Sequence, residues 1–313
     1  MPYNPNFISG HRIPLPEIVA AEAFPGSPLH YHHHSIVMNP ERKFAFFSAS
    51  NTDGISWKPI DRKGGFKKDS NLEPQFQLGP ELYESINGRR DRDNDFDEGH
   101  LTSFQEVLWG KENESSIAGA DTFFYTNCVP QHGSLNRGAW RSLEQYLVKK
   151  GADPNELKIS VMTGPLLLSS DPYFINAIDG ELVKLPIAFW KVIYYKAVQG
   201  LQAVGFMMSH RNLLLEDKTI TFDKDEVTRS ANEELDDVFM MFPKATTYQV
   251  NISFIEKISG MRFFSEGVNF PFNQQISREL IFKRIEVERP RGMEDEVSLA
   301  DAPMDYQLEN ILI

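Results

Sequence analysis

Two short segments of the chain hold the side chains best suited to chemistry. The first, residues 95–104 with the sequence DFDEGHLTSF, places His100 after a glycine at the end of a polar loop. A neutral imidazole there can act as a general base near pH 7, because its unperturbed pKa is about 6.5. A histidine that only hydrogen-bonds its own loop is the alternative, and the glycine–histidine pair alone favours that alternative.

The second segment, NCVPQHGSLNRGAWRSLEQYL at residues 127–147, carries the pattern of a helix. Trp140, Leu143 and Leu147 recur at the i, i+3, i+7 spacing of one helical face. Gly151 follows them in the position of a C-cap. The pattern predicts a helix from about residue 136 to residue 150, entered through a polar turn.

Two polar side chains of this helix could address one metal ion. Asn136 stands at the predicted start, and Glu144 follows eight residues later, about 12 Å along the axis and within about 80° of the same azimuth. An amide oxygen with a carboxylate suits a hard cation that keeps most of its waters, as Mg²⁺ does. An asparagine N-cap followed by a surface glutamate is the alternative interpretation of the same residues.

Three groups of residues in and between these segments follow one another in a family-specific order. They are Asp97-Glu98-Gly99-His100, then residues 121–123 (DTF) with 126–131 (TNCVPQ), then residues 136–144 with Asn136, Gly138, Trp140, Leu143 and Glu144. This arrangement resembles the DNA/RNA non-specific endonuclease family, the endonuclease G-like branch of the ββα-metal nucleases. The resemblance extends to the framework and covers most of residues 2–260.

The resemblance implies a fold and a mechanism. The fold would be α+β, the ββα-metal or His-Me finger nuclease fold, with a central antiparallel sheet flanked by helices. His100 would be the general base that deprotonates a water, Asn136 the direct protein ligand of Mg²⁺ or Mn²⁺, and Glu144 a group that holds the ion's waters. The reaction would be hydrolysis of phosphodiester bonds in DNA and RNA.

One residue departs from the family pattern. Glu98 stands where the family has arginine, beside the expected phosphate. At an effective dielectric of about 20, a like charge about 6 Å away costs about 3 kcal/mol. Arg137 could offset this charge, as could Arg89, Arg90, Arg92 and Arg141, or Glu98 could recruit a second cation or point elsewhere. Two functions stay open: a nuclease whose site includes Glu98 and Arg137, and an altered or inactive relative that binds a partner.

Composition limits the partners. The 313 residues carry 32 basic and 44 acidic side chains, a net charge of −12, so a nucleic acid would need a local basic site. The single cysteine, Cys128, excludes an internal disulfide and a cysteine-rich zinc site. The absence of a long apolar run and of a signal-peptide pattern indicates a soluble protein, cytoplasmic or exported. The family resemblance adds a homodimer and a protein inhibitor as partners to test.

The chain divides by composition into three parts. We expect a proline-rich extended arm at residues 1–30, a nuclease-like catalytic domain at 31–288 and an acidic tail at 289–313. Short β-prone runs in the catalytic domain predict its strands. These runs are a strand pair at 35–39 and 43–51, a strand at 121–127 that stops before Pro130, and core strands at 157–168, 186–195 and 201–209, with an amphipathic piece at 250–260.

Other patterns favour structural roles. His32 and His34 would share a strand face, but no carboxylate or cysteine lies at ligand spacing nearby, which favours exposed histidines entering a strand over a metal site. Residues 91–102 superficially resemble a calcium loop, but the positions of its turn glycine and bidentate glutamate hold Phe96 and Thr102. Cys128 is interpreted as a small core residue.

Overall fold

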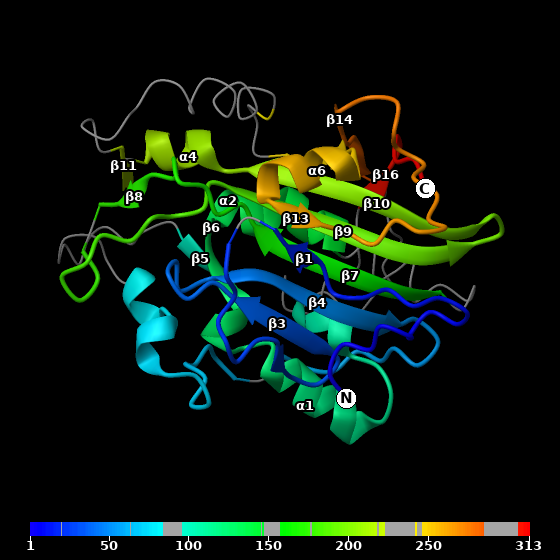
Figure 1. Cartoon of the computed structure of the whole chain (residues 1–313), viewed down its shortest axis with the longest axis horizontal. Coiled ribbons are helices and arrows are strands. Elements are labelled where there is room, and N and C mark those ends of the chain that lie inside the picture. Colours follow the sequence, from blue (N-terminus) through cyan, green and yellow to red (C-terminus); the bar gives the residue numbers. More distant parts are fainter. Residues whose placement is uncertain are drawn as a thin grey trace, which may run out of the picture.

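An eight-stranded antiparallel sheet forms the centre of the molecule, in the strand order β14-β12-β10-β9-β7-β4-β3-β2 (Figure 1). The computed structural model describes residues 1–19, 21–62, 64–83, 96–144, 146, 157–175, 177–217, 219–222, 242, 246–284 and 306–313. The strands are β2 (Leu29–His30), β3 (His34–Met38), β4 (Ala45–Asp53), β7 (Lys158–Pro165), β9 (Ala188–Ala197), β10 (Gly200–Ser209), β12 (Tyr248–Val250) and β14 (Ser277–Glu279).

The apolar runs of the sequence form the middle of this sheet, as predicted. The run at 35–39 lies in β3 and the run at 43–51 in β4, and the two strands pair antiparallel. β7, β9 and β10 correspond to the three predicted core strands, with β9 and β10 in register from Ala188 opposite Ser209 to Ala197 opposite Gly200. Their β-branched and aromatic side chains are buried along most of their length, which fixes the register of the strands.

The strand predicted at 121–127 is wrong. Helix α1 (Glu112–Asp121) ends where that strand was expected to begin, and η5 (Tyr125–Asn127) is a 3₁₀ turn. The strand is β6 (Cys128–His132), and it includes Pro130. Proline lacks an N–H donor but is tolerated here because β6 belongs to a two-stranded sheet, whose outer edges need no donor.

Helices lie on both sides of the sheet (Figure 1). α1 lies beside the β3 and β4 end, and α6 (Ile252–Ser259) packs near β10. The amphipathic piece predicted at 250–260 is this helix, which begins after the N-cap Asn251 and ends at Gly260 in the left-handed conformation with φ 67°. The other short elements are α4 (Arg211–Glu216), η1 (Pro74–Phe76), η2 (Pro80–Leu82), η4 (Phe104–Val107), β8 (Tyr173–Phe174) and β11 (Ile220–Thr221).

Both ends of the chain contact the sheet region. In the N-terminal arm, Ile8 and Ile13 are buried, and β1 (Glu17–Ile18) pairs with β13 (Met261–Arg262). At the other end, β16 (Tyr306–Leu308) pairs with β15 (Phe282–Arg284). The division into arm, catalytic domain and tail stays a prediction, and residues 289–305 lie outside the described residues.

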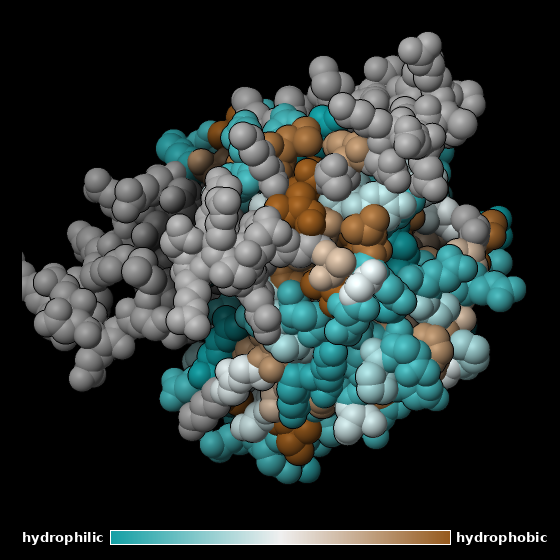
Figure 2. Space-filling model, turned by 90° about the vertical axis from the view of Figure 1, so that its left-hand side faces the viewer, coloured by the Kyte–Doolittle hydropathy of each residue, from teal (hydrophilic) through white to brown (hydrophobic). Residues whose placement is uncertain are grey.

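The surface at the end that carries α4, β8 and β11 is mixed in character. Figure 2 shows hydrophobic residues gathered near the middle of this face and hydrophilic residues below them. Leu215 of α4 and Phe222 after β11 are among the exposed apolar side chains. Within the described residues, no helix is long and apolar enough to cross a membrane.

Candidate active site

A two-stranded hairpin carries the residues of the first motif. β5 (Phe96–His100) pairs antiparallel with β6, with His100 opposite Cys128 and Phe96 opposite His132. A Cβ atom at Gly99 would overlap the buried side chain of Gln131, so the glycine before His100 is required by packing. The hairpin therefore fixes His100 at the end of a strand, next to the segment that enters the helix.

The helix of the second motif begins earlier than predicted. α2 (Gly133–Leu135) starts after His132, whose Nδ1 accepts a hydrogen bond from the backbone N–H of Ser134 at 3.1 Å. The Nε2 atom of His132 lies 2.7 Å from Oδ2 of Asp217. Asn136 lies one turn inside, with helical φ −61° and ψ −46°, so its interpretation as the N-cap is wrong because His132 supplies that acceptor.

The helix is also interrupted between the two predicted metal-site residues. η6 (Asn136–Trp140) contains Gly138 with φ −100° and ψ −113°, and helical geometry resumes at residues 141–144. The rotation of 100° per residue therefore does not hold between Asn136 and Glu144, because the kink changes their relative orientation. The predicted helix end at residues 147–150 and Gly151 lie outside the described residues.

Asp97 joins the hairpin to this helix. Its Oδ2 accepts a hydrogen bond from Nδ2 of Asn136 at 3.1 Å and lies 3.1 Å from Nε of Arg137. Because the amide nitrogen of Asn136 is held by a carboxylate, its carbonyl oxygen is the atom left to bind a cation. Arg137 is 71% exposed, so its ion pair contributes little to stability. Asp97 lies in the first motif but was not among the predicted site residues.

His100 lies in an aromatic environment. Its ring centroid is 4.7 Å from that of Phe66 and 5.2 Å from that of Phe123. Nε2 of His100 is buried without a hydrogen-bond partner. Burial, with smaller contributions from the charges of Arg62 and His34, lowers the pKa of His100 to about 3. The imidazole is therefore neutral at pH 7 and has an unprotonated nitrogen.

The predicted base and the predicted metal ligand belong to different groups of contacts. Asn136 and Arg137 meet at Asp97, whereas the ring contacts of His100 are with aromatic side chains. In the described part of the chain there is no hydrogen bond between His100 and Asn136. No group of three or more His, Cys, Asp or Glu residues there could hold a metal ion, so a cage of charged ligands is absent from these residues. A hydrated ion on one amide oxygen fits this donor set.

Glu98, the departure from the family pattern, contacts a tyrosine. The hydroxyl of Tyr125 donates a hydrogen bond to Oε1 of Glu98 at 3.2 Å. Glu98 lies opposite Pro130 in the hairpin and is partly buried. Residues 84–95, with three of the arginines considered as compensation, lie outside the described residues, so that compensation stays a prediction.

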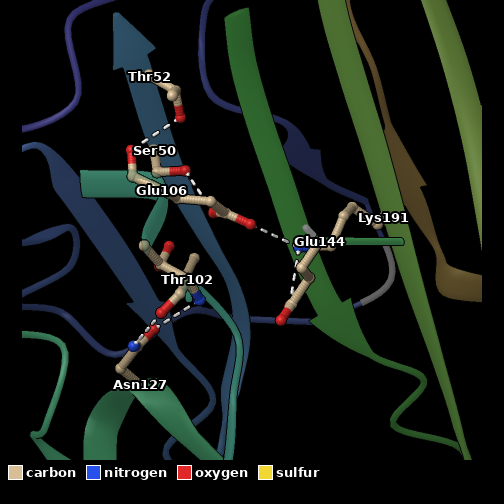
Figure 3. Close-up of polar contacts among 8 residues, drawn as sticks. Ser50, Thr52, Thr102, Glu106, Asn127, Glu144 and Lys191 are labelled. Carbon is tan, nitrogen blue, oxygen red and sulfur yellow. Dashed lines mark hydrogen bonds and ion pairs between the residues drawn. The ribbon is translucent and has the colours of Figure 1, made fainter. Parts of the chain in front are cut away.

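Glu144 is held by a buried lysine that the sequence interpretation missed. Nζ of Lys191 lies 3.5 Å from Oε1 of Glu144 and donates a hydrogen bond to Oε1 of Glu106 at 2.9 Å (Figure 3). Burial raises the pKa of Glu144 to about 7, and the charge of Lys191 opposes this. Burial alone would lower the pKa of Lys191, but the two carboxylates raise it above its ordinary value, so the ammonium is charged. The available signal was a single lysine inside the apolar run PIAFWKVIYY.

The remaining candidates have structural environments. His32 is 41% exposed and its Nδ1 lies 2.9 Å from Oδ2 of Asp121. His34 begins β3 but is fully buried, so the expectation of an exposed histidine is wrong there. Cys128 is buried, and burial raises the pKa of its thiol, which agrees with a core residue. The calcium-loop pattern falls largely on residues 91–95, outside the described residues.

Comparisons with known proteins place the chain in a family. The family model described as DNA/RNA non-specific endonuclease matches residues 19–270. An uncharacterised protein, y4fB of Sinorhizobium fredii, is 33% identical over 222 residues, which cover 65% of this chain and 32% of that protein. Human mitochondrial endonuclease G is 31% identical over 115 residues, covering 35% of this chain and 36% of that protein. The chain thus spans about a third of the length of these two relatives.

A solved structure supports the fold assignment. A chain from the crystal structure of the EndoG/EndoGI complex aligns with a TM-score of 0.50 at 20% identity, covering 77% of this chain and 87% of that chain. The likeness confirms the predicted α+β fold, the ββα-metal nuclease fold with a large antiparallel sheet. Together with the family model, which matches most of the sequence, these findings show that the chain belongs to the DNA/RNA non-specific endonuclease family.

Proposed function

We propose that this chain is a metal-dependent non-specific endonuclease that hydrolyses phosphodiester bonds in DNA and RNA. The observation that carries the proposal is the junction of hairpin and helix. There Asp97, three residues before His100 in the chain, accepts a hydrogen bond from the amide of Asn136. Family membership supplies the reaction class, and this junction supplies residues suited to it.

His100 would act as the general base. Its neutral imidazole can take a proton from water at an unprotonated ring nitrogen when that water attacks phosphorus. Phe66 and Phe123 pack beside the ring and contribute to the burial that keeps it neutral. A pKa this far below 7 also makes the neutral imidazole a weaker base than one with the unperturbed value of about 6.5, so the proton that it takes from water is quickly returned.

Asn136 and Glu144 would hold a Mg²⁺ or Mn²⁺ ion. The carbonyl oxygen of Asn136 would be the direct ligand, oriented by the hydrogen bond from its amide nitrogen to Asp97. Glu144 would accept hydrogen bonds from the waters of the ion, since it lies in the helical residues that follow η6 and its side chain is 15% exposed. When bound, the ion would supply stabilisation of the charge that develops on the phosphate and the leaving oxygen.

Arg137 and Glu98 would set the electrostatics around the phosphate. Arg137 is mostly exposed beside Asp97 and can reach a backbone phosphate, whereas Glu98 adds a negative charge on the same strand. Contacts through phosphates carry no sequence information, which agrees with a non-specific enzyme.

The test compares cleavage by the wild type and by His100→Ala. We expect plasmid DNA and RNA to be degraded by the wild type with Mg²⁺, with no degradation in EDTA, and a rate at least 100-fold lower for the variant, on the order of the general-base contribution. His32→Ala, a histidine variant outside the hairpin, is the matched control and should cleave like the wild type. Equal rates for wild type and His100→Ala would remove the catalytic assignment.

A second function rests on Glu98. A carboxylate in place of arginine beside His100 suits a non-catalytic relative that serves as a binding or interaction protein. The two functions differ in one measurement: cleavage that requires Mg²⁺ and is lost in Asn136→Ala supports the nuclease, whereas a purified chain that leaves DNA and RNA intact supports the binding protein.

The partners of the chain are also proposed. The structural neighbour was crystallised as the EndoG/EndoGI complex, which is described as a mechanism of EndoG inhibition, and this motivates a protein inhibitor for this chain as well. A homodimer is a further proposal, tested by the mass of the purified chain in light scattering. We also propose a division of the chain into three parts. Residues 31–288 would form the catalytic domain, with the arm at 1–30 and the tail at 289–313 outside it.

A further inference from the structure

A fully buried lysine lies in the centre of the sheet, behind the candidate active site. Lys191 of β9 is 0% exposed and stands between apolar neighbours in the strand. Its Nζ lies 5.2 Å from the ring centroid of Trp140, the last residue of η6. Burial of an ammonium is costly unless it is paired, so this residue has partners that hold it there.

Glu106 alone is sufficient to neutralise the buried ammonium. Its Oε1 accepts a hydrogen bond from Lys191 at 2.9 Å, and its Oε2 accepts one from the hydroxyl of Ser50 at 3.0 Å. The backbone carbonyl of Glu106 accepts a further bond from Thr52 at 2.8 Å. Ser50 and Thr52 both belong to β4, so the side chain and the backbone of Glu106 are both fixed to that strand (Figure 3).

Glu144 is therefore a second carboxylate beside an ammonium that is already paired. Its Oε1 lies 3.5 Å from Nζ of Lys191, a longer contact than that of Glu106, and its side chain is 15% exposed whereas that of Glu106 is 1% exposed. Lys191 thus holds one oxygen of Glu144 from the protein side. The small exposed fraction of the side chain is the route by which we expect its second oxygen, Oε2, to meet a ligand from the solvent side.

The lysine also links the two halves of the site. Glu106 lies in η4, six residues after His100, and Glu144 lies in the helical residues that follow η6, eight residues after Asn136. Figure 3 shows the side chains of both carboxylates directed toward Lys191 from different segments of the chain. The ammonium of Lys191 thus contacts two segments: η4, which follows the proposed base His100, and the helical residues that follow the proposed metal ligand Asn136.

We propose that Lys191 is a positioning residue of this nuclease, which orients Glu144 toward the waters of a divalent cation bound at Asn136. The inference rests on the proposed function, because it assigns Lys191 its task through that metal site. Lys191 itself touches neither substrate nor ion.

The test measures cation binding apart from catalysis. In Lys191→Met we expect the Kd for Mn²⁺, measured by electron paramagnetic resonance without nucleic acid, to rise at least tenfold. We expect kcat to fall by at least the same factor, with KM for DNA changed less than twofold. Arg42→Met is the matched control, because Arg42 pairs with the buried Asp171 at 2.7 Å, remote from these residues in the sequence, and its loss should destabilise the chain while Mn²⁺ binding is kept.

A double variant separates positioning from folding. Lys191→Met leaves Glu106 as an unpaired buried carboxylate, whereas Lys191→Met with Glu106→Gln removes that charge and keeps an acceptor for Ser50. The double variant should regain thermal stability but not Mn²⁺ affinity. Wild-type affinity in either variant would overturn the inference. If the wild type cleaves nucleic acid and binds Mn²⁺ while Lys191→Met does the same, only the inference fails; if the wild type does neither, the proposed function fails with it.

Discussion

Buried His210 should weaken the fold as the pH falls from 7 to 5. It is 1% exposed, its Nδ1 accepts a hydrogen bond from the backbone N–H of His132 at 3.1 Å, and its Nε2 lies 2.9 Å from the carbonyl oxygen of Pro186. A carbonyl only accepts, so Nε2 carries the proton and Nδ1 does not. Protonation of Nδ1 would make it a donor that faces the donating N–H of His132, and this would break the hydrogen bond.

The magnitude follows from the pKa. Burial lowers the pKa of His210 from 6.5 to about 4. Because the folded state prefers the neutral form, the stabilising contribution is complete above about pH 6.5 and is lost as the pH falls toward 4. With a pKa of about 6.5 in the unfolded chain, the loss between pH 7 and pH 5 is about 2 kcal/mol.

Other buried groups change stability over the same range, so the total slope is not diagnostic. His34, whose pKa burial lowers to about 4, acts in the same direction as His210. Asp171 and Glu144 act in the opposite direction, because burial raises their pKa values to about 6 and about 7 and favours proton uptake by the folded state. A comparison of variants isolates one histidine from this sum.

The assay is urea unfolding, followed by tryptophan fluorescence at pH 7 and pH 5, of the wild type and His210→Asn. Asparagine keeps an acceptor near the position of Nδ1 but does not titrate. The variant should be less stable at pH 7, because it leaves space in the core, and the gap should shrink by about 2 kcal/mol at pH 5. His30→Asn, at an exposed position, is the control. A gap for His210→Asn that is equal at both pH values, within about 0.5 kcal/mol, would refute the reasoning.

Three further predictions test the site and its support. Glu98→Arg should raise kcat/KM for DNA at least tenfold over Glu98→Gln in a nuclease assay, because it replaces a charge that repels phosphate; a ratio near one would show that Glu98 lies away from the substrate. Gly164→Ala should lower the free energy of unfolding by about 1–3 kcal/mol in urea, because the added Cβ would overlap the carbonyl oxygen of Phe46 and the ring of Trp190, and unchanged stability would count against this packing. Affinity for DNA, measured by fluorescence anisotropy with Ca²⁺, should fall steeply from 50 to 200 mM salt, since phosphate contacts release counterions; a flat response would exclude a phosphate-dominated interface.

The core of the fold was predictable because its strands are apolar on both faces. β7, β9 and β10 read as runs of β-branched and aromatic residues separated by turns, and the structure confirms them. The strand at 121–127 was misassigned because aromatic residues in a 3₁₀ turn have the same local composition as a strand. The real strand begins at Cys128, and its proline hid it, since whether proline is tolerated depends on a partner strand that local sequence does not show.

The motifs identified the candidate site residues but not the contacts that hold them. The helical spacing of Asn136 and Glu144 suggested one straight helix, yet the kink at Gly138 breaks that geometry. The local sequence gives no sign that this glycine adopts non-helical backbone angles. What orients Glu144 is instead Lys191, 47 residues away in the sequence. A lysine inside an apolar strand costs free energy when its ammonium is buried unpaired, so its presence there indicates either a buried carboxylate partner or an ammonium that reaches solvent. The sequence does not show which carboxylate pairs with Lys191, because the packing of a helix against a sheet decides the pairing. The positioning of Glu144 was therefore visible only in the structure.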